Sequence, residues 1–214
     1  MLFCIYMFYG EYIIFGYIKG EFHMRICILM GSPRTNGNTA ELCKHFSNEL
    51  RLHKAEVEYI ILHDKNISPC LGCCRCQNTA DAYGCVLQDD MQTIIEKILW
   101  ADVVVFATPI YTWQATVPMK AVMDRMFGLN KFYGTAPRTV LNEGQAYALI
   151  ATCGYEPTRG ADLLDEAIQR LCTHSGLRYL GMYAAQDTDG SASFQTPEAI
   201  SGAATFAQNI LQYK

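Results

Sequence analysis

The densest group of reactive side chains in this sequence is a run of cysteines between positions 70 and 85, where five of the ten cysteines lie. Cys70, Cys73 and Cys76 follow a C-x2-C-x2-C pattern, and Cys85 comes after eight further residues. Two such spacings in succession bring three thiolates into one small loop. This arrangement resembles iron–sulfur ligation more than structural zinc, which prefers two separated pairs. The ligands predicted for a [4Fe–4S] cluster are Cys70, Cys73, Cys76 and Cys85.

Three other interpretations of this cysteine group stay open: a reduced thiol loop at a subunit interface, a redox disulfide and, last, a zinc site. A chain of 214 residues needs no disulfide to fold, so the cysteines do not form a stabilising framework. Their clustering favours metal or redox chemistry in a reducing cytoplasm, which is where we expect the protein. Cys74 breaks the x2 register, and we expect its side chain to point away.

A second group of polar residues, GSPRTNGNT at positions 31–39, follows an apolar run and precedes a helical pattern. It has neither the Gly-Lys-Ser/Thr ending of a nucleotide P-loop nor a GxGxxG motif, so ATP and dinucleotides are poor candidates. Backbone N–H groups and hydroxyls at a helix N-terminus suit one terminal phosphate. An ordinary capped loop uses the same residue types and stays open. The residues predicted to hold a phosphate are Ser32, Arg34, Asn36, Gly37, Asn38 and Thr39.

These groups are positioned by alternating strands and helices. Apolar runs predict strands at residues 25–30, 56–62, 103–107, 146–151 and 177–183. Helical spacing predicts helices at residues 39–52, 89–100, 117–127, 161–174 and 198–212, with Asp89 capping the second of them. Five strand–helix repeats predict a three-layer αβα fold, a doubly wound parallel sheet of the flavodoxin-like order 2-1-3-4-5.

In this fold, ligands bind beyond the carboxyl ends of the strands, at the point where the strand order reverses. The loops after the first, third and fourth strands, residues 31–38, 109–116 and 152–160, should therefore form one site. Tyr111 and Trp113 in the second loop could close the core, but their place beyond a central strand favours a ligand contact.

Three ordered segments carry a resemblance to a known family. GSPRTNGNT, ADVVVFATPIY at positions 101–111 and MKAVMDR at positions 119–125 resemble the NADPH-dependent FMN reductase family, which is flavodoxin-like. The resemblance covers residues 24–125. It implies an FMN cofactor whose flat ring lies against apolar and aromatic residues. The residues it implies around that ring are Pro109, Ile110, Tyr111 and Trp113, with Thr152 and Gly154 at the other edge.

The cysteine group is also similar to that of the iron–sulfur flavoprotein branch of this family, and Asp89-Asp90 follows Cys85 as it does there. The gap between Cys76 and Cys85 is longer than in that branch, which puts the cluster in question.

The expected function is transfer of two electrons from NAD(P)H through FMN to a small acceptor such as a flavin or quinone. Flavin carries this chemistry, so no catalytic acid or base is expected. An alternative is an electron-transfer module that ferredoxin reduces. A flavin-dependent sensor or binding protein is a third class.

Composition limits the remaining possibilities. Half of the residues are hydrophobic and the net charge is −4, without a basic run interleaved with aromatics, so nucleic acid is not an expected partner. Residues 1–23 are apolar but fit neither a secretory signal nor a bilayer span, and Met24 precedes the first strand. We expect an extension over residues 1–23, with a surface membrane anchor as the alternative. Residues 24–214 are expected to form one domain that assembles as a homodimer or homotetramer.

Overall fold

The sheet of this protein matches the predicted order. The computed structural model describes residues 23–132, 138–188 and 194–213, so the predicted N-terminal extension lies outside the described residues except for His23. Five parallel strands pair in the order β2-β1-β3-β6-β7, which in chain order is 2-1-3-4-5. They are β1 (Arg25–Met30), β2 (Glu56–Ile61), β3 (Val103–Pro109), β6 (Ala146–Cys153) and β7 (Arg178–Gln186). The predicted flavodoxin-like fold is confirmed.

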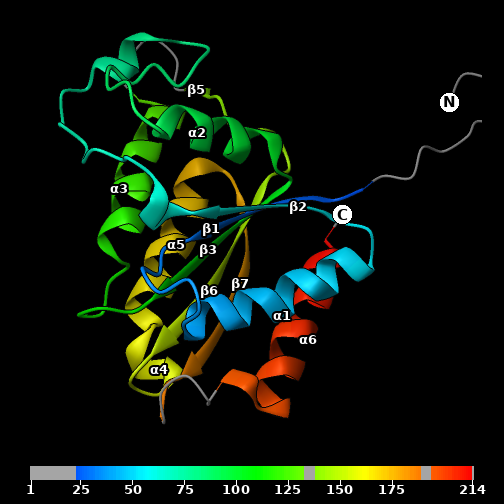
Figure 1. Cartoon of the computed structure of the whole chain (residues 1–214). Coiled ribbons are helices and arrows are strands. Elements are labelled where there is room, and N and C mark those ends of the chain that lie inside the picture. The colour runs from blue at the N-terminus through cyan, green and yellow to red at the C-terminus, as the bar shows by residue number, and fades with distance from the viewer. Residues whose placement is uncertain (1–22, 133–137, 189–193, 214) are drawn as a thin grey trace, which may run out of the picture.

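Helices cover both faces of the sheet (Figure 1). One layer holds α1 (Asn38–Leu52) and α6 (Pro197–Leu211), and the other holds α2 (Met91–Trp100), α3 (Val117–Arg125) and α5 (Asp162–Ser175). The central strand β3 is buried along its whole length. Its side chains alternate, so that Val104 and Phe106 pack on the second layer while Val103 and Val105 pack on the first. Because both faces are covered, the inner strands β1, β3 and β6 are nearly continuous apolar runs.

Several boundaries differ from the prediction. β6 and β7 extend to Cys153 and Gln186 because backbone pairing continues past the end of each apolar run. The predicted loop after β6 contains a short helix, α4 (Pro157–Gly160), and a two-stranded hairpin, β4 (Asn130–Lys131) with β5 (Arg138–Thr139), follows α3. Within the described ranges, no helix is both long enough and apolar enough to cross a bilayer.

The cysteine-rich insertion, residues 68–88, is held to the domain by buried polar side chains. Gln77, in the short helix η2 (Arg75–Asn78), donates to the carbonyl oxygens of Phe127 and Asn130 at 3.2 and 2.8 Å. The Lys131 ammonium donates to three carbonyl oxygens, those of Cys76, Tyr83 and Gly128, at 2.5–3.2 Å. Burial lowers the pKa of Lys131. These hydrogen bonds hold the insertion against η3 (Met126–Leu129) and β4.

A buried ion pair joins the insertion to α2 and α3. The Arg125 guanidinium donates to both carboxylate oxygens of Asp89 at 2.8 and 2.6 Å, and the two side chains are 1% and 4% exposed. Asp89 also accepts from the N–H groups of Ser68 and Met91, and its own N–H donates to Gln92. The predicted cap on α2 is thus present, with Arg125 as an additional partner.

Replacing Arg125 with methionine should cost about 3–5 kcal/mol of stability, because it leaves the Asp89 carboxylate buried without its cation. Urea unfolding measures the loss. Lys120→Met is the matched control, since Lys120 pairs with Asp124 on the exposed face of the same helix and should cost less than about 1 kcal/mol. Equal unfolding midpoints for the two variants would show that the buried pair contributes no more than a surface pair.

The same pair should make stability depend on pH. Burial alone would raise the pKa of the Asp89 carboxyl, but hydrogen bonds from Arg125 and from the Ser68 and Met91 N–H groups outweigh it and hold the pKa below 3.8. This contribution is fully present above the unfolded-state pKa of about 3.9 and is lost as the pH falls through the lower folded-state value. Urea midpoints measured between pH 6 and pH 3 should fall more steeply in the unmodified protein than in Asp89→Asn. Parallel curves would contradict this.

Candidate functional site

Three predicted loops meet at the carboxyl edge of the sheet. Thr152, near the end of β6, joins the other two: its hydroxyl lies 2.8 Å from that of Thr39 in the first turn of α1, and its carbonyl accepts from Ile110 N–H at 2.8 Å. The Asn38 amide donates to Asp187, which follows β7, at 2.7 Å. The structure therefore brings residues from four strand ends to one place.

The N-terminus of α1 is open to an anion. Its N-cap is Gly37, and no side chain of the described residues caps it. The Ser32 hydroxyl is instead part of a turn, accepting from Arg34 N–H at 3.1 Å. The first N–H groups of a helix lack intrahelical partners and carry the positive end of its dipole. Arg34 is exposed beside them, so the loop fits one phosphate group better than it fits an ordinary capped turn.

Gly31 allows the loops after β1 and β3 to approach closely. The Thr116 hydroxyl donates to its carbonyl at 2.7 Å, and a Cβ added at Gly31 would lie 2.8 Å from that hydroxyl oxygen. Any side chain here would push Thr116 and the start of α3 away from β1. This contact fixes the second loop relative to the first.

The second loop contains a strained turn. Tyr111 and Gln114 exchange two backbone hydrogen bonds of 3.0 Å, and the residues between them, Thr112 and Trp113, have φ values of 51° and 60°. Both angles lie in the left-handed region required by a type I′ turn. Non-glycine residues there cost about 1–2 kcal/mol each. Strain of this kind concentrates at binding sites, where the surrounding structure has to maintain it.

Two exposed aromatic rings stand over this edge. Trp113 and Tyr155 stack with centroids 5.9 Å apart and planes 11° apart, and the Trp113 indole N–H donates to the Arg159 carbonyl at 3.0 Å. They flank a groove at the ends of β3 and β6. The residues lining it are Ile110, Thr112, Trp113, Cys153, Gly154, Tyr155 and Gly160. An apolar groove beside an open helix N-terminus suits a flat ring that carries a phosphorylated chain.

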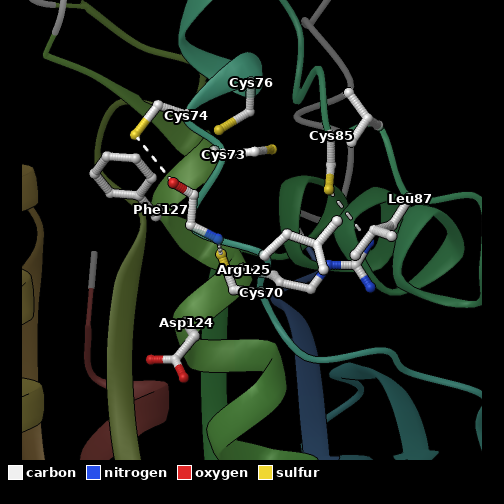
Figure 2. Close-up of a pocket in the computed structure, with 13 residues that line it drawn as sticks. Cys70, Cys73, Cys74, Cys76, Cys85, Leu87, Asp124, Arg125 and Phe127 are labelled. Carbon is white, nitrogen blue, oxygen red and sulfur yellow. Dashed lines mark hydrogen bonds between the residues drawn. The ribbon is translucent and has the colours of Figure 1, made fainter.

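The cysteines of the insertion line a separate pocket at the C-terminal end of α3 (Figure 2). They are Cys70, Cys73, Cys74, Cys76 and Cys85. Figure 2 shows the Cys85 sulfur on the side of Arg125, whose guanidinium donates to it at 3.4 Å. The Cys74 thiol instead donates to the Gly72 carbonyl at 3.7 Å. Because α3 begins at the second loop and ends at Arg125, one helix joins the edge groove to the cysteine pocket.

The surroundings of Cys85 in this pocket favour its negatively charged thiolate form. Burial alone would raise the pKa of its thiol, but the Leu87 N–H, the Arg125 guanidinium and the Tyr83 hydroxyl outweigh burial and lower it. By contrast, burial raises the pKa of Cys153 in the edge groove. The cysteine pocket therefore favours ionisation of its Cys85 thiol, whereas the edge groove disfavours ionisation of Cys153.

The arrangement does not fit a metal cluster as it stands. Within the described ranges, no three His, Cys, Asp or Glu side chains are grouped closely enough to hold a metal ion. The predicted ligands share one pocket, but Cys85 is turned to Arg125 and Cys70 and Cys73 are exposed. The four-cysteine ligand set stays a prediction.

Sequence reasoning missed three residues of the edge. Asp187 could have been found, because it directly follows β7 and polar residues at parallel strand ends share one edge. Thr116 resembles an ordinary helix cap in the sequence, and nothing in the pattern indicates its bond to Gly31. Tyr155 belongs to a predicted loop, but its stacking on Trp113 depends on contacts across the groove.

The comparisons with known proteins agree with this geometry. A protein identified as an iron–sulfur flavoprotein from Methanocaldococcus jannaschii is 33% identical over 102 residues, covering 48% of this chain and 51% of the relative. Another, from Archaeoglobus fulgidus, is 30% identical over 131 residues, covering 61% and 56%. The chain thus spans about half the length of these relatives.

The solved structure of an NAD(P)H:quinone oxidoreductase from Methanothermobacter marburgensis has the same fold. Its TM-score is 0.67 at 17% identity, and the match covers 90% of this chain and 99% of that one. The family model for NADPH-dependent FMN reductases matches residues 24–185, which include β1 to β6 and most of β7. This match covers most of the chain and all three loops of the carboxyl edge. The chain therefore belongs to the NADPH-dependent FMN reductase family.

Proposed function

We propose that this protein is an FMN-dependent oxidoreductase that takes electrons from NAD(P)H and passes them to a small acceptor. The observation that carries the proposal is the open N-terminus of α1 beside an apolar, aromatic groove at one edge of the sheet. Family membership supports it, as does the solved quinone oxidoreductase of the same fold.

The proposed phosphate contacts are the predicted ones. The first N–H groups of α1 would bind the FMN phosphate, with Arg34 adding positive charge. The side chains and backbone groups of this part of the site are Ser32, Arg34, Asn36, Gly37, Asn38 and Thr39. Asn38 and Thr39 contact Asp187 and Thr152, which positions the first turn of α1 for this role.

The ring would lie against the loops after β3 and β6. The residues proposed to contact it are Pro109, Ile110, Tyr111, Trp113, Thr152 and Gly154. FMN would supply the two-electron chemistry between nicotinamide and acceptor, while the chain binds and orients it. The Ile110 N–H–Thr152 carbonyl bond fixes the two loops relative to each other, and the apolar lining of the groove limits access of water to the ring.

The phosphate assignment predicts a large loss of FMN affinity in a triple variant carrying Ser32→Ala, Arg34→Gln and Thr39→Ala. These changes remove one cation and two hydroxyls, and charge-assisted bonds contribute about 1.5–3 kcal/mol each. We expect FMN affinity to fall at least tenfold in a titration followed by flavin fluorescence.

The matched control is Ser201→Ala, Arg170→Gln and Thr173→Ala, the same three changes at exposed positions on α5 and α6. This control should bind FMN as the unmodified protein does. FMN affinity that is equal in the two triple variants would remove the phosphate assignment.

A second candidate function is an iron–sulfur flavoprotein that serves as an electron-transfer module reduced by ferredoxin. The C-x2-C-x2-C pattern supports it, as do the names of the relatives. Cys70, Cys73, Cys76 and Cys85 would have to move together to form a ligand set, and their position in one pocket is the observation in favour.

Anaerobic purification followed by iron and acid-labile sulfide analysis separates the two candidates. If a cluster is held by four thiolates, Cys→Ser at position 70, 73, 76 or 85 should each lower the iron content at least severalfold. Cys74→Ser is the control and should retain iron, since its thiol bonds to the Gly72 carbonyl. Near-zero iron in the unmodified protein, together with rapid NAD(P)H oxidation in the presence of FMN, would exclude the iron–sulfur module. The FMN-dependent oxidoreductase would then be the remaining candidate.

A further inference from the structure

We propose that Cys76 and Cys85 form a reversible dithiol–disulfide couple, a second redox site that lies at the opposite end of α3 from the groove. Its substrates are small disulfides and thiols. The inference starts from the poor fit of the cysteine pocket to a metal cluster. It goes beyond the proposed function, because flavin takes no part in it.

A disulfide needs two thiols in place, whereas a [4Fe–4S] cluster needs four ligands held at once. Two of the five thiols that line the pocket are directed to their own loop. The Cys70 sulfur accepts from the Gly72 N–H at 3.4 Å, and the Cys74 thiol donates to the Gly72 carbonyl at 3.7 Å. Figure 2 shows the Cys74 and Cys85 sulfur atoms on opposite sides of the pocket. The partners that remain for Cys85 are Cys73 and Cys76.

Cys76 is the favoured partner because the backbone beside Cys85 lies directly against it. The Lys131 ammonium donates to the carbonyl oxygens of Cys76 and Tyr83 at 2.9 and 3.2 Å, which holds together the two ends of the segment between the cysteines. Gly84 lies so close that a Cβ added there would be 3.2 Å from the Cys76 carbonyl oxygen. Because both thiols also line one pocket, a short movement of Cys85 brings the two sulfur atoms to bonding distance.

The exposure of the thiols determines the size of the substrate. Cys73 is exposed, whereas Cys76 and Cys85 are half-buried. A half-buried sulfur can be reached by a small disulfide but not by one held rigidly in a protein surface, since exchange requires direct access to the sulfur. The Arg125 guanidinium donates to the Cys85 sulfur at 3.4 Å, which stabilises this sulfur as the attacking thiolate.

The reaction is thiol–disulfide exchange in two steps. In the first, the Cys85 thiolate attacks one sulfur of a small disulfide, RSSR. A bond between Cys85 and RS forms, the bond within RSSR breaks, and one RS⁻ leaves. In the second, Cys76 attacks the Cys85 sulfur, the mixed disulfide breaks, and the second RS⁻ leaves. The protons of the two cysteine thiols pass to the released thiolates. The cysteines lose two electrons and RSSR is reduced to two RSH, and the reverse reaction restores the dithiol.

The tryptic peptides of this chain allow the couple to be measured directly. Cleavage after Arg75 and Lys97 gives peptide 76–97, which contains Cys76 and Cys85 and no other cysteine. Peptide 66–75 contains the other three thiols of the pocket and serves as the internal control. The full-length protein is equilibrated with mixtures of oxidised and reduced glutathione, quenched with acid, alkylated with N-ethylmaleimide and analysed by mass spectrometry.

We expect peptide 76–97 to escape alkylation and to become two hydrogen atoms lighter, while peptide 66–75 is alkylated at all three thiols. Half-oxidation should need about tenfold less oxidised glutathione in the folded protein than in concentrated urea, because the fold raises the effective concentration of one thiol at the other. Cys76→Ser should retain Cys85 as a mixed disulfide with glutathione. Cys73→Ser is the matched control and should leave the oxidation of peptide 76–97 unchanged.

Three results would overturn the inference. Peptide 76–97 could be fully alkylated at every glutathione ratio, or oxidised equally in folded and unfolded protein, and the fold would then contribute nothing. A disulfide that links peptide 66–75 to peptide 76–97 would assign a different partner. About four iron atoms per chain after anaerobic purification, lost in Cys76→Ser, would make this thiol a cluster ligand. The glutathione measurement requires neither flavin binding nor NAD(P)H oxidation, so failure of the proposed function is detected separately.

Discussion

The ion pair between Arg125 and Asp89 is the interaction on which the arrangement of this protein most depends. It is buried, and each partner makes further bonds: Asp89 to the backbone at both ends of the insertion, and Arg125 to the Ser68 carbonyl and the Cys85 sulfur. A buried charge without its partner is costly, so the two helices and the insertion must be placed correctly together. An inserted segment that looks like a surface loop is in this way made part of the domain.

The other constraint is the parallel sheet. Parallel strands end at the same edge, so residues far apart in the chain, such as Thr39 and Thr152, come within hydrogen-bond distance. The close approach at Gly31 then fixes the loop after β3 against the end of β1. These contacts bring the groove and the open N-terminus of α1 to the same edge of the sheet.

Sequence patterns predicted the order of the strands because apolar runs and helical spacing are local and strong. β1 was predicted to the residue. The bond between Asp89 and Arg125, 36 residues apart, was not, because no local pattern links a helix cap to a distant helix end. The stacking of Trp113 on Tyr155 was missed for the same reason. The spacing of the cysteines was enough to predict that four thiols lie in one loop. Their orientation could not be predicted, because it depends on contacts of Cys85 with Arg125 and of Cys76 with Gln77.

The length of α3 sets the distance between the groove beyond β3 and β6 and the cysteine pocket. α3 has nine residues and ends at Arg125, so the helix rises about 13 Å from the loop after β3. One residue added to or removed from this helix would turn everything beyond it by about 100° and carry Arg125 away from Asp89. A change in the length of α3 would therefore break the ion pair between Arg125 and Asp89, whereas a change in the loops on either side of the helix need not. The spacing of the groove and the cysteine pocket is thereby fixed, whatever ligands the two come to bind.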